Sequence, residues 1–375
     1  MVLDLGSGSG ILSIMAAQLG ARRVVGVEEC GDLVRLSRRN VAANGFEHIV
    51  EIHHCVASEL EPDELADVLV TETLGTWMTC EGIVQYCEDA RWRLLKQGAL
   101  IIPERGTQYS VLVESAELER LFTPPSYRGI DLSAVMELQD TASCLWSKRL
   151  GIRPSDLVYR ELCAPFPVLS ADFNNTVSDS LPSSQQTCVR TLEGRIHAVL
   201  DFWVVEDAQG RQLSTNPRAR RCEPWAYARD VAWGNGFHLV AEEPPDDDTR
   251  WAVFHDTEVS EVPSGSLSMG ANALHVCRGI CLYHGHTGFV TRDGKAIFLS
   301  CTREEMLNEQ RHVLGSTLHV SMEEYGTPGL DPSRPMVPIP MDVADDEKLV
   351  VTSLFHSDHR GAQHLLRRIR PEERR

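Results

Sequence analysis

A glycine-rich turn near the start of the chain constrains its fold more than any other feature. The apolar run 2–5 leads into the turn Gly6–Gly10 (GSGSG), and the helix-forming run 11–17 follows directly. Glycine allows the backbone to turn tightly and to approach a ligand closely. A strand, a glycine turn and a helix in this order predict the first unit of an α/β domain with a ligand site at the turn.

The same alternation of strands and helices continues through the first hundred residues. Further strands are predicted at 23–27, 49–54, 68–72 and 98–103, and further helices at 33–43 and 82–95. On the first of these helices, Leu33, Leu36 and Val41 are expected to face inward. The spacing predicts a mostly parallel, doubly wound sheet, which is the Rossmann-like α/β class.

The residues around the glycine turn indicate which ligand it holds. Glu28 ends the second predicted strand, eighteen residues after Gly10, where a carboxylate can accept both hydroxyls of a ribose. Ala57 and Ser58 follow the third strand, where an adenine ring would lie. The GxGxG spacing favours S-adenosyl-L-methionine, which has no pyrophosphate to cradle. A dinucleotide, or a tight turn without a ligand, stays open as an alternative.

Two carboxylates lie on one short loop after the fourth predicted strand. Glu72 follows the apolar run 68–70, and Glu81 comes nine residues later, with an uncharged stretch between them. Two carboxylates can bind a planar guanidinium cation through paired hydrogen bonds. The alternative is that Glu81 stabilises the start of the following helix while Glu72 is a surface residue.

Several of these motifs resemble those of the protein arginine methyltransferases. The runs 2–13, 25–28 and 72–81 resemble the family's motif I, post-I motif and double-E loop. The run 249–254 is similar to its Thr-His-Trp loop, with Arg250 in place of histidine. The runs 70–72, 80–82, 112–115, 154–157, 171–173 and 194–203 are similar to the type III, monomethylating branch. The likeness is strong over 2–115, moderate over 150–260 and weak beyond.

The resemblance implies two domains and a set of functional residues. A class I S-adenosylmethionine-binding domain would span 1–105, and a β-barrel substrate-binding domain would span 106–375 with a dimerisation arm at about 117–165. The implied residues are Asp4, Gly6, Gly8, Gly10, Glu28, Ala57 and Ser58 for the cofactor, Glu72 and Glu81 for catalysis, and Trp77, Arg250 and Trp251 for the substrate. A single glycine motif implies a homodimer.

The implied reaction is methyl transfer from S-adenosylmethionine to arginine in Arg-Gly-rich proteins or histones, forming ω-N-monomethylarginine. The family's N-terminal helices would precede Met1, so we expect an incomplete chain or an impaired catalyst. A catalytically weak scaffold or regulatory subunit is therefore one alternative. A methyltransferase acting on a small molecule or a nucleic acid is another.

The second half and the composition add further expectations. Short β runs are predicted at 108–113, 196–205, 251–254, 273–283, 289–291, 296–300 and 349–355, and the Arg-rich tail 359–375 is expected to be a solvated end. The net charge of −18 disfavours nucleic acid and favours basic protein partners.

Cysteine usage and hydropathy predict where the protein resides. Eleven scattered cysteines indicate reduced thiols in the cytoplasm or nucleus, and no run suggests a membrane segment. Cys277, Cys281, His284 and His286 have loosely zinc-like spacing, but buried thiols and surface histidines are the favoured interpretation. We therefore predict no metal site.

Overall fold

The structure is a computed structural model whose contacts divide the chain into two compact units. Unit 1 comprises 1–109, 169–182 and 202–233, and unit 2 comprises 110–168, 183–201 and 234–375. The residues that the structure describes are 1–61, 63–122, 128–130, 145–147, 152, 154, 156–219, 233–239, 241–242, 252–257, 270–277, 280–283, 286–290, 295–298, 318–319, 341–355 and 361–369. Within this part of the chain, no helix is long and apolar enough to cross a membrane.

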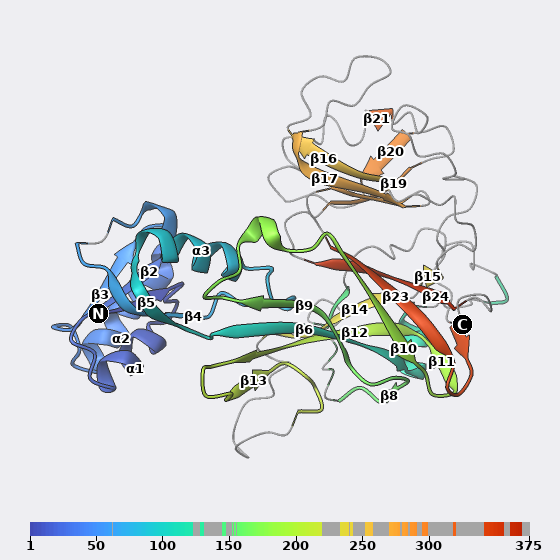
Figure 1. Ribbon diagram of the computed structural model, residues 1–375, viewed down its shortest axis with the longest axis horizontal. Coiled ribbons are helices and arrows are strands. Elements are labelled where there is room, and N and C mark those ends of the chain that lie inside the picture. Colours follow the sequence, from blue (N-terminus) through green and yellow to red (C-terminus); the bar gives the residue numbers. More distant parts are fainter. Residues whose placement is uncertain are drawn as a thin grey trace. The chain divides into compact units, whose positions relative to one another are not determined.

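Unit 1 is built on a five-stranded parallel sheet (Figure 1). Its strands are β1 (Val2–Leu5), β2 (Val24–Glu28), β3 (Val50–His54), β4 (Ala66–Thr71) and β5 (Leu95–Ile102). Their order is β3-β2-β1-β4-β5, and every neighbouring pair is parallel. The predicted Rossmann-like sheet is confirmed. The strand order reverses direction between β1 and β4, which is where such sheets bind ligands.

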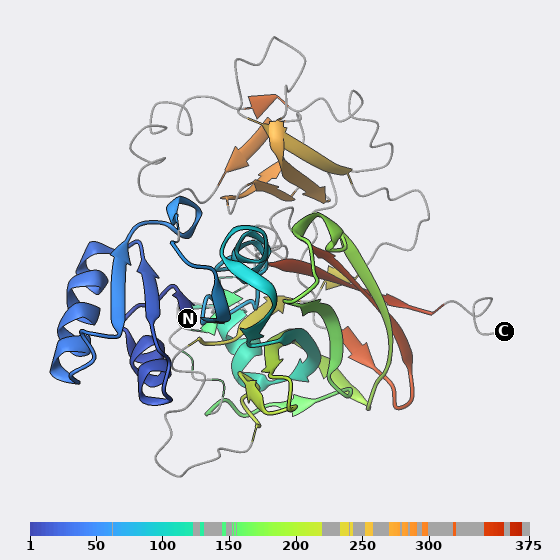
Figure 2. The same ribbon diagram turned by 60° about the vertical axis from the view of Figure 1, so that its left-hand side comes forward.

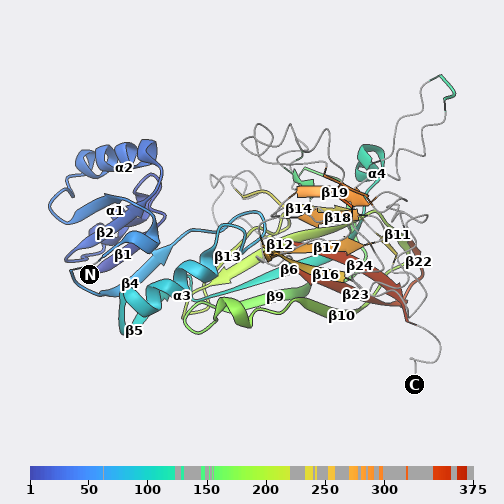
Figure 3. The ribbon, with the colours of Figure 1, turned by 90° about the horizontal axis from the view of Figure 1, so that it is seen from above.

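Helices cover both faces of this sheet. Helices α1 (Ile11–Gln18) and α2 (Gly31–Ala43) lie on one face and α3 (Ile83–Arg93) on the other, as Figures 1 and 3 show. The core between α1, α2 and the sheet consists of Ile14, Ala17, Val24, Val34, Val41, Val50 and Ile52.

The predicted inward face of α2 was partly wrong. The helix buries Val34, Ser37 and Val41, whereas Leu33 and Leu36 are 37% and 43% exposed. The glycine turn explains the rotation, because a Cβ atom on Gly10 would lie only 3.1 Å from Ser37 Cβ. Only a small side chain fits at that contact, and serine at 37 therefore faces the turn while the leucines do not.

Unit 1 also contains strands from later in the chain. Parts of β6 (Arg105–Glu114), β9 (Phe166–Asp172) and β12 (Ala198–Glu206) fall in it, together with β13 (Gln212–Ser214) and the 3₁₀ turn η3 (Ser178–Ser180). The Glu104 N–H donates to the Glu206 carbonyl and the Phe173 N–H donates to the Glu104 carbonyl, both at 2.9 Å. These bonds hold the later strands against the chain that leaves β5.

Unit 2 is rich in β-structure, and its described residues include the helix α4 (Ala116–Phe122). Its remaining strands are β7 (Leu145–Trp146), β8 (Arg160–Glu161), β10 (Ser184–Arg190), β11 (Gly194–Ile196), β14 (Gly236–Leu239), β15 (Ala241–Glu242), β22 (Met341–Val343), β23 (Lys348–Phe355) and β24 (Ala362–Arg368). They form the sheets β10-β23-β24-β15 and β11-β22, and β7, β14 and β8 belong to the sheet of β12 and β6.

A further sheet of unit 2, drawn in orange in Figure 2, has the order β16-β17-β18-β19-β20-β21. Its strands are β16 (Ala252–Thr257), β17 (Gly270–Cys277), β18 (Ile280–Tyr283), β19 (His286–Val290), β20 (Lys295–Phe298) and β21 (Leu318–His319). Closure of the strands into a barrel stays a prediction.

Two expectations for the second half were wrong. The run 273–283 is not one strand but an antiparallel pair, since β17 ends at Cys277 and β18 begins at Ile280. The tail is not solvated throughout, because 362–368 forms β24 opposite β23 and buries Ala362, Leu365 and Leu366. Leucines among the arginines supply the apolar face that a strand needs.

Candidate functional site

The loops that follow β1, β2, β3 and β4 meet at the carboxyl edge of the parallel sheet. They carry most of the functional residues predicted for unit 1. Gly6, Gly8 and Gly10 have φ angles of 74°, 53° and 82°, in the left-handed region that favours glycine. A Cβ atom on Gly6 would lie 3.0 Å from Thr73 Cγ2, so the glycine turn packs directly against the loop that carries the two acids.

Glu28 is tied to the glycine turn by its own carboxylate. Its Oε2 accepts a 2.9 Å hydrogen bond from the Gly8 N–H, and its Oε1 accepts one of 2.9 Å from the Cys30 N–H. The side chain is buried. An ionised carboxylate has about four acceptor positions, so two positions are left for the hydroxyls of a ribose.

Two buried polar atoms beside the turn lack a hydrogen-bond partner among the described residues, namely Asp4 Oδ1 and Ser7 Oγ. The other oxygen of Asp4, Oδ2, accepts a 2.6 Å hydrogen bond from Ser13 Oγ. Burial raises the pKa of Asp4 to about 6. Buried polar atoms in proteins are normally satisfied, so these two fit a polar ligand at the turn.

The predicted adenine-side residues lie on the 3₁₀ turn η1 (Ala57–Glu59), where Ala57 is buried and Ser58 is exposed. Arg93 at the end of α3 holds this turn, because its Nη2 donates to the Ala57 carbonyl at 3.1 Å and its Nη1 to the Leu60 carbonyl at 3.0 Å. The sequence interpretation missed Arg93, since an arginine near the end of a helix is an ordinary surface residue by pattern alone.

The acid loop is packed into unit 1 along its middle and exposed at its two ends. Leu74, Trp77 and Met78 are buried, whereas Glu72 and Glu81 are exposed. A Cβ atom on Gly75 would lie 2.0 Å from Cys80 Sγ and 3.3 Å from Glu81 Oε1. The end of the loop at Cys80 and Glu81 therefore folds back against Gly75, and both Glu72 and Glu81 remain exposed.

Two tryptophans from distant parts of the chain hold this loop. Trp233 Nε1 donates a 2.6 Å hydrogen bond to Glu72 Oε1, and Thr76 Oγ1 donates to the Trp233 carbonyl. Trp203 Nε1 donates to the Gly75 carbonyl at 2.8 Å. The two indole rings meet edge to face, with centroids 5.3 Å apart. Sequence reasoning did not assign Trp233 a role, and no local pattern marks it.

Glu72 has an altered proton affinity. Although the residue is exposed on one side, the protein around its carboxyl raises its pKa, and the neighbouring charge of Glu81 adds to the rise. The hydrogen bond from Trp233 acts in the opposite direction. Glu72 is thus a carboxylate in partly apolar surroundings, where its interaction with a cation is stronger than in water.

The structure describes only one of the three predicted substrate residues. Trp77 is 1% exposed, so its indole packs inside unit 1. Arg250 and Trp251 lie outside the described residues. Among the described residues, an aromatic side chain that does contact one of the two acids is Trp233, which hydrogen-bonds Glu72.

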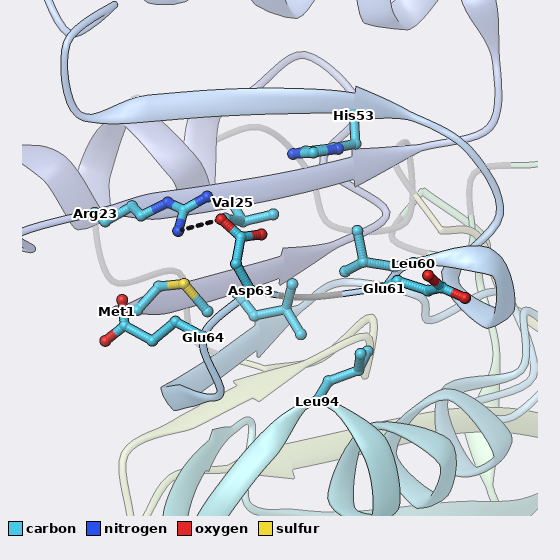
Figure 4. Close-up of a pocket in the computed structure, with 10 residues that line it drawn as sticks. Met1, Arg23, Val25, His53, Leu60, Glu61, Asp63, Glu64 and Leu94 are labelled. Carbon is cyan, nitrogen blue, oxygen red and sulfur yellow. Dashed lines mark hydrogen bonds and ion pairs between the residues drawn. The ribbon is translucent and has the colours of Figure 1, made fainter.

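A small cavity in unit 1 lies away from this edge, beside the amino ends of β1 and β2. Figure 4 shows Met1, Arg23, His53 and Asp63 around it, with Arg23 Nη1 3.3 Å from Asp63 Oδ2. Its volume is about 10 Å³, close to the minimum for one water molecule. It is too small for a nucleoside.

Comparison with known proteins places the fold among the methyltransferases. Residues 1–103 match the family model described as ribosomal protein L11 methyltransferase (PrmA). The solved structure of a Trypanosoma brucei PRMT1 enzyme–prozyme heterotetrameric complex with AdoHcy superposes with a TM-score of 0.51 at 18% identity, covering 80% of this chain and 85% of the other. The first domain therefore has a Rossmann-like fold with a parallel sheet, similar to that of these methyltransferases.

Sequence relatives point to one family. Protein arginine N-methyltransferase 1 of Dictyostelium discoideum is 25% identical over 59% of this chain and 64% of its own length. Protein arginine N-methyltransferase 7 of Danio rerio is 30% identical over 65% of this chain and 37% of its own length. The chain thus spans roughly a third to two thirds of these relatives. Both relatives are protein arginine N-methyltransferases, and they come from more than one branch of that family.

Proposed function

We propose that this chain transfers a methyl group from S-adenosyl-L-methionine to a guanidino nitrogen of arginine in proteins. The observation that carries the proposal is the placing of Glu72 and Glu81 on one packed loop whose residue Thr73 touches the glycine turn at Gly6. A donor site and a pair of carboxylates for a cation then lie side by side at the switch point of the sheet.

The residues at the glycine turn fit the methyl donor. Asp4 Oδ1 and Ser7 Oγ are buried acceptors or donors for its polar end, and Glu28 is held ready for its ribose. The turn offers space as well, since a Cβ atom on Gly8 would meet nothing nearer than the Gly6 carbonyl oxygen at 3.9 Å. When bound, the donor supplies an electrophilic methyl group on a positively charged sulfur.

The acid pair would convert a poor nucleophile into a better one. A guanidinium is delocalised and its pKa exceeds about 12, so its nitrogens are weakly nucleophilic. Glu72 and Glu81 would each hydrogen-bond part of the guanidinium, hold it in position and draw its positive charge to one side. Glu81 would accept the proton that leaves with methyl transfer. The hydrogen bond from Trp233 fixes Glu72 Oε1 and would hold this carboxylate in place for the substrate.

The finer features of the proposal follow from the family resemblance. They are monomethylation, a β-barrel substrate domain, a homodimer, and a location in the cytoplasm or nucleus. Arg-Gly-rich proteins or histones are the proposed substrates, and the net charge of −18 supports basic partners.

Charge-neutral substitutions of the two acids test the reaction. We expect Glu72→Gln and Glu81→Gln each to lower the rate of methyl transfer to an Arg-Gly-rich peptide by at least about 100-fold, since each removes a preorganised charge at the reacting group. Mass spectrometry of the peptide would count the methyl groups. The exposed Glu47 serves as control, and Glu47→Gln should keep the parental rate. Parental rates in both acid variants would rule out the acid-pair mechanism.

A non-catalytic scaffold is the second candidate. It is favoured by the hydrogen bond from Trp233 to Glu72, which occupies one of the oxygens that a substrate could use. Calorimetric titration with S-adenosylmethionine separates the two functions. Binding supports the enzyme, and an absence of binding heat at several temperatures supports the scaffold.

A further inference from the structure

Three buried side chains of unit 2, remote in sequence from one another, bring metal-binding atoms together. Asp201 lies on β12, His238 on β14 and His364 on β24, and they are 1%, 0% and 0% exposed. One carboxylate oxygen and one ring nitrogen from each histidine all lie within 4.8 Å of one another. None of the three belongs to the candidate active site.

One of the two distances within this cluster matches the ligand spacing of a metal centre, and the other is shorter. His238 Nε2 lies 2.6 Å from Asp201 Oδ2, and His364 Nε2 lies 3.4 Å from Asp201 Oδ1. A tetrahedral zinc ion with bonds of about 2.0–2.1 Å holds its ligand atoms roughly 3.3 Å apart. A shift of less than about 1 Å in His238 would therefore open the space for an ion.

The outer atoms of the cluster are held as metal ligands usually are. Ser353, directly opposite His364 in the β23–β24 pair, places its Oγ 2.9 Å from His364 Nδ1. Ser110 Oγ donates a 2.5 Å hydrogen bond to Asp201 Oδ1, and Asn235 Nδ2 donates to the Asp201 carbonyl at 2.9 Å. The Ser353 contact fixes the ring of His364 with its Nε2 toward Asp201, as outer contacts do for metal-binding histidines.

We propose that Asp201, His238 and His364 bind a zinc ion that joins β24 to the β12–β14 pair. Two imidazoles and a carboxylate are common zinc ligands. The same ligand types bind non-haem iron(II), but such iron sites need open positions for their reactants, and these three side chains are almost fully buried. A divalent cation also offsets the cost of a carboxylate in the interior.

Metal content tests the proposal on the full chain. After expression in zinc-supplemented medium and gel filtration in metal-free buffer, we expect about one zinc per chain by inductively coupled plasma mass spectrometry. Substitution by cobalt(II) should give the visible absorption of a tetrahedral site without thiolate-to-cobalt charge transfer, which separates this cluster from Cys277 and Cys281. Zinc below 0.1 per chain, with no cobalt spectrum on titration, would overturn the proposal.

Matched variants locate the site. We expect Asp201→Asn and His364→Gln to lower bound zinc at least about tenfold, whereas His364→Cys, which restores a ligand, should retain zinc and add a thiolate band. His197→Gln is the control, because His197 is also buried in unit 2 but its Nδ1 accepts the Ser115 N–H. Unchanged zinc in folded Asp201→Asn and His364→Gln would refute the assignment. Should these variants fail to fold, the cobalt spectrum of the parental chain decides.

Discussion

Asp4 shows how burial alters a single residue. Its carboxyl is inaccessible to water, and burial raises its pKa to about 6, against the lowering effect of the hydrogen bond from Ser13. Carrying a charge at pH 7 therefore costs the folded protein free energy. A residue kept at such a cost is typical of a ligand site rather than of a stabilising contact.

The raised pKa of Asp4 should make the stability of the protein depend on pH. Between about pH 4 and 6 the folded protein binds a proton at Asp4 that the unfolded chain has released, so the free energy of unfolding falls as pH rises through this window. We expect the free energy of unfolding of Asp4→Asn to be about 2 kcal/mol higher than that of the parent at pH 7. This difference should vanish near pH 4.

Urea unfolding at a series of pH values would measure this difference. The exposed Asp32 is the control, and Asp32→Asn should follow the parental pH dependence in this window. Identical slopes for Asp4→Asn and the parent would contradict the buried, charged state of Asp4.

At the scale of the element, the acid loop is an irregular segment made rigid by side chains from elsewhere. The Met78 N–H donates to Gln108 Oε1 at 2.9 Å, and Trp203 Nε1 donates to the Gly75 carbonyl at 2.8 Å. Backbone groups that a helix or strand would satisfy internally are thus satisfied by distant side chains. The position of the two carboxylates depends on these contacts as much as on β4.

Removing one of these contacts should weaken the loop. Trp203→Phe keeps most of the ring volume but leaves the buried Gly75 carbonyl without its indole donor, which costs about 1–3 kcal/mol. We expect a loss of that size in urea unfolding and a lower methyl-transfer rate. Trp92 is 81% exposed on α3, so Trp92→Phe should change stability by less than about 0.5 kcal/mol. Equal effects of the two substitutions would show that the Trp203 hydrogen bond contributes nothing.

At the scale of the whole molecule, the strong negative charge bears on how substrates reach the site. The chain has 54 acidic residues against 36 lysines and arginines. Long-range attraction then raises the local concentration of basic peptides and not of the small methyl donor. This effect concerns association and leaves the chemical step unchanged.

Salt should therefore act on substrate binding. On the proposed function, raising the salt from 0.1 to 1 M shortens the Debye length from about 10 to 3 Å, and we expect KM for an Arg-Gly-rich peptide to rise several-fold while kcat stays constant. A peptide with one arginine and otherwise neutral residues should show a much smaller rise. Steady-state kinetics with both peptides would check this, and equal KM changes would exclude steering by net charge.

The sequence by itself determined the parallel sheet of unit 1, the glycine turn, and the common edge on which Glu28 and Glu72 both lie. These features follow from local patterns, because strand and helix periodicities and glycine preferences act over a few neighbouring residues. The predictions for the buried face of α2 and for the tail that forms β24 were wrong, because both features depend on distant partners. The fit of Ser37 against Gly10, and the pairing of β24 with β23, depend on partners that no local pattern contains.

Only the tertiary structure decided which distant side chains complete the two polar sites. Trp233 reaches Glu72 across 161 positions of sequence, and Asp201 meets His364 in the interior of unit 2. The free energy of such contacts depends on burial and on hydrogen-bond geometry, and both arise when the chain packs. The sequence around a single tryptophan or histidine does not indicate such contacts. A glycine turn between a strand and a helix, by contrast, is a local pattern that can be recognised from the sequence.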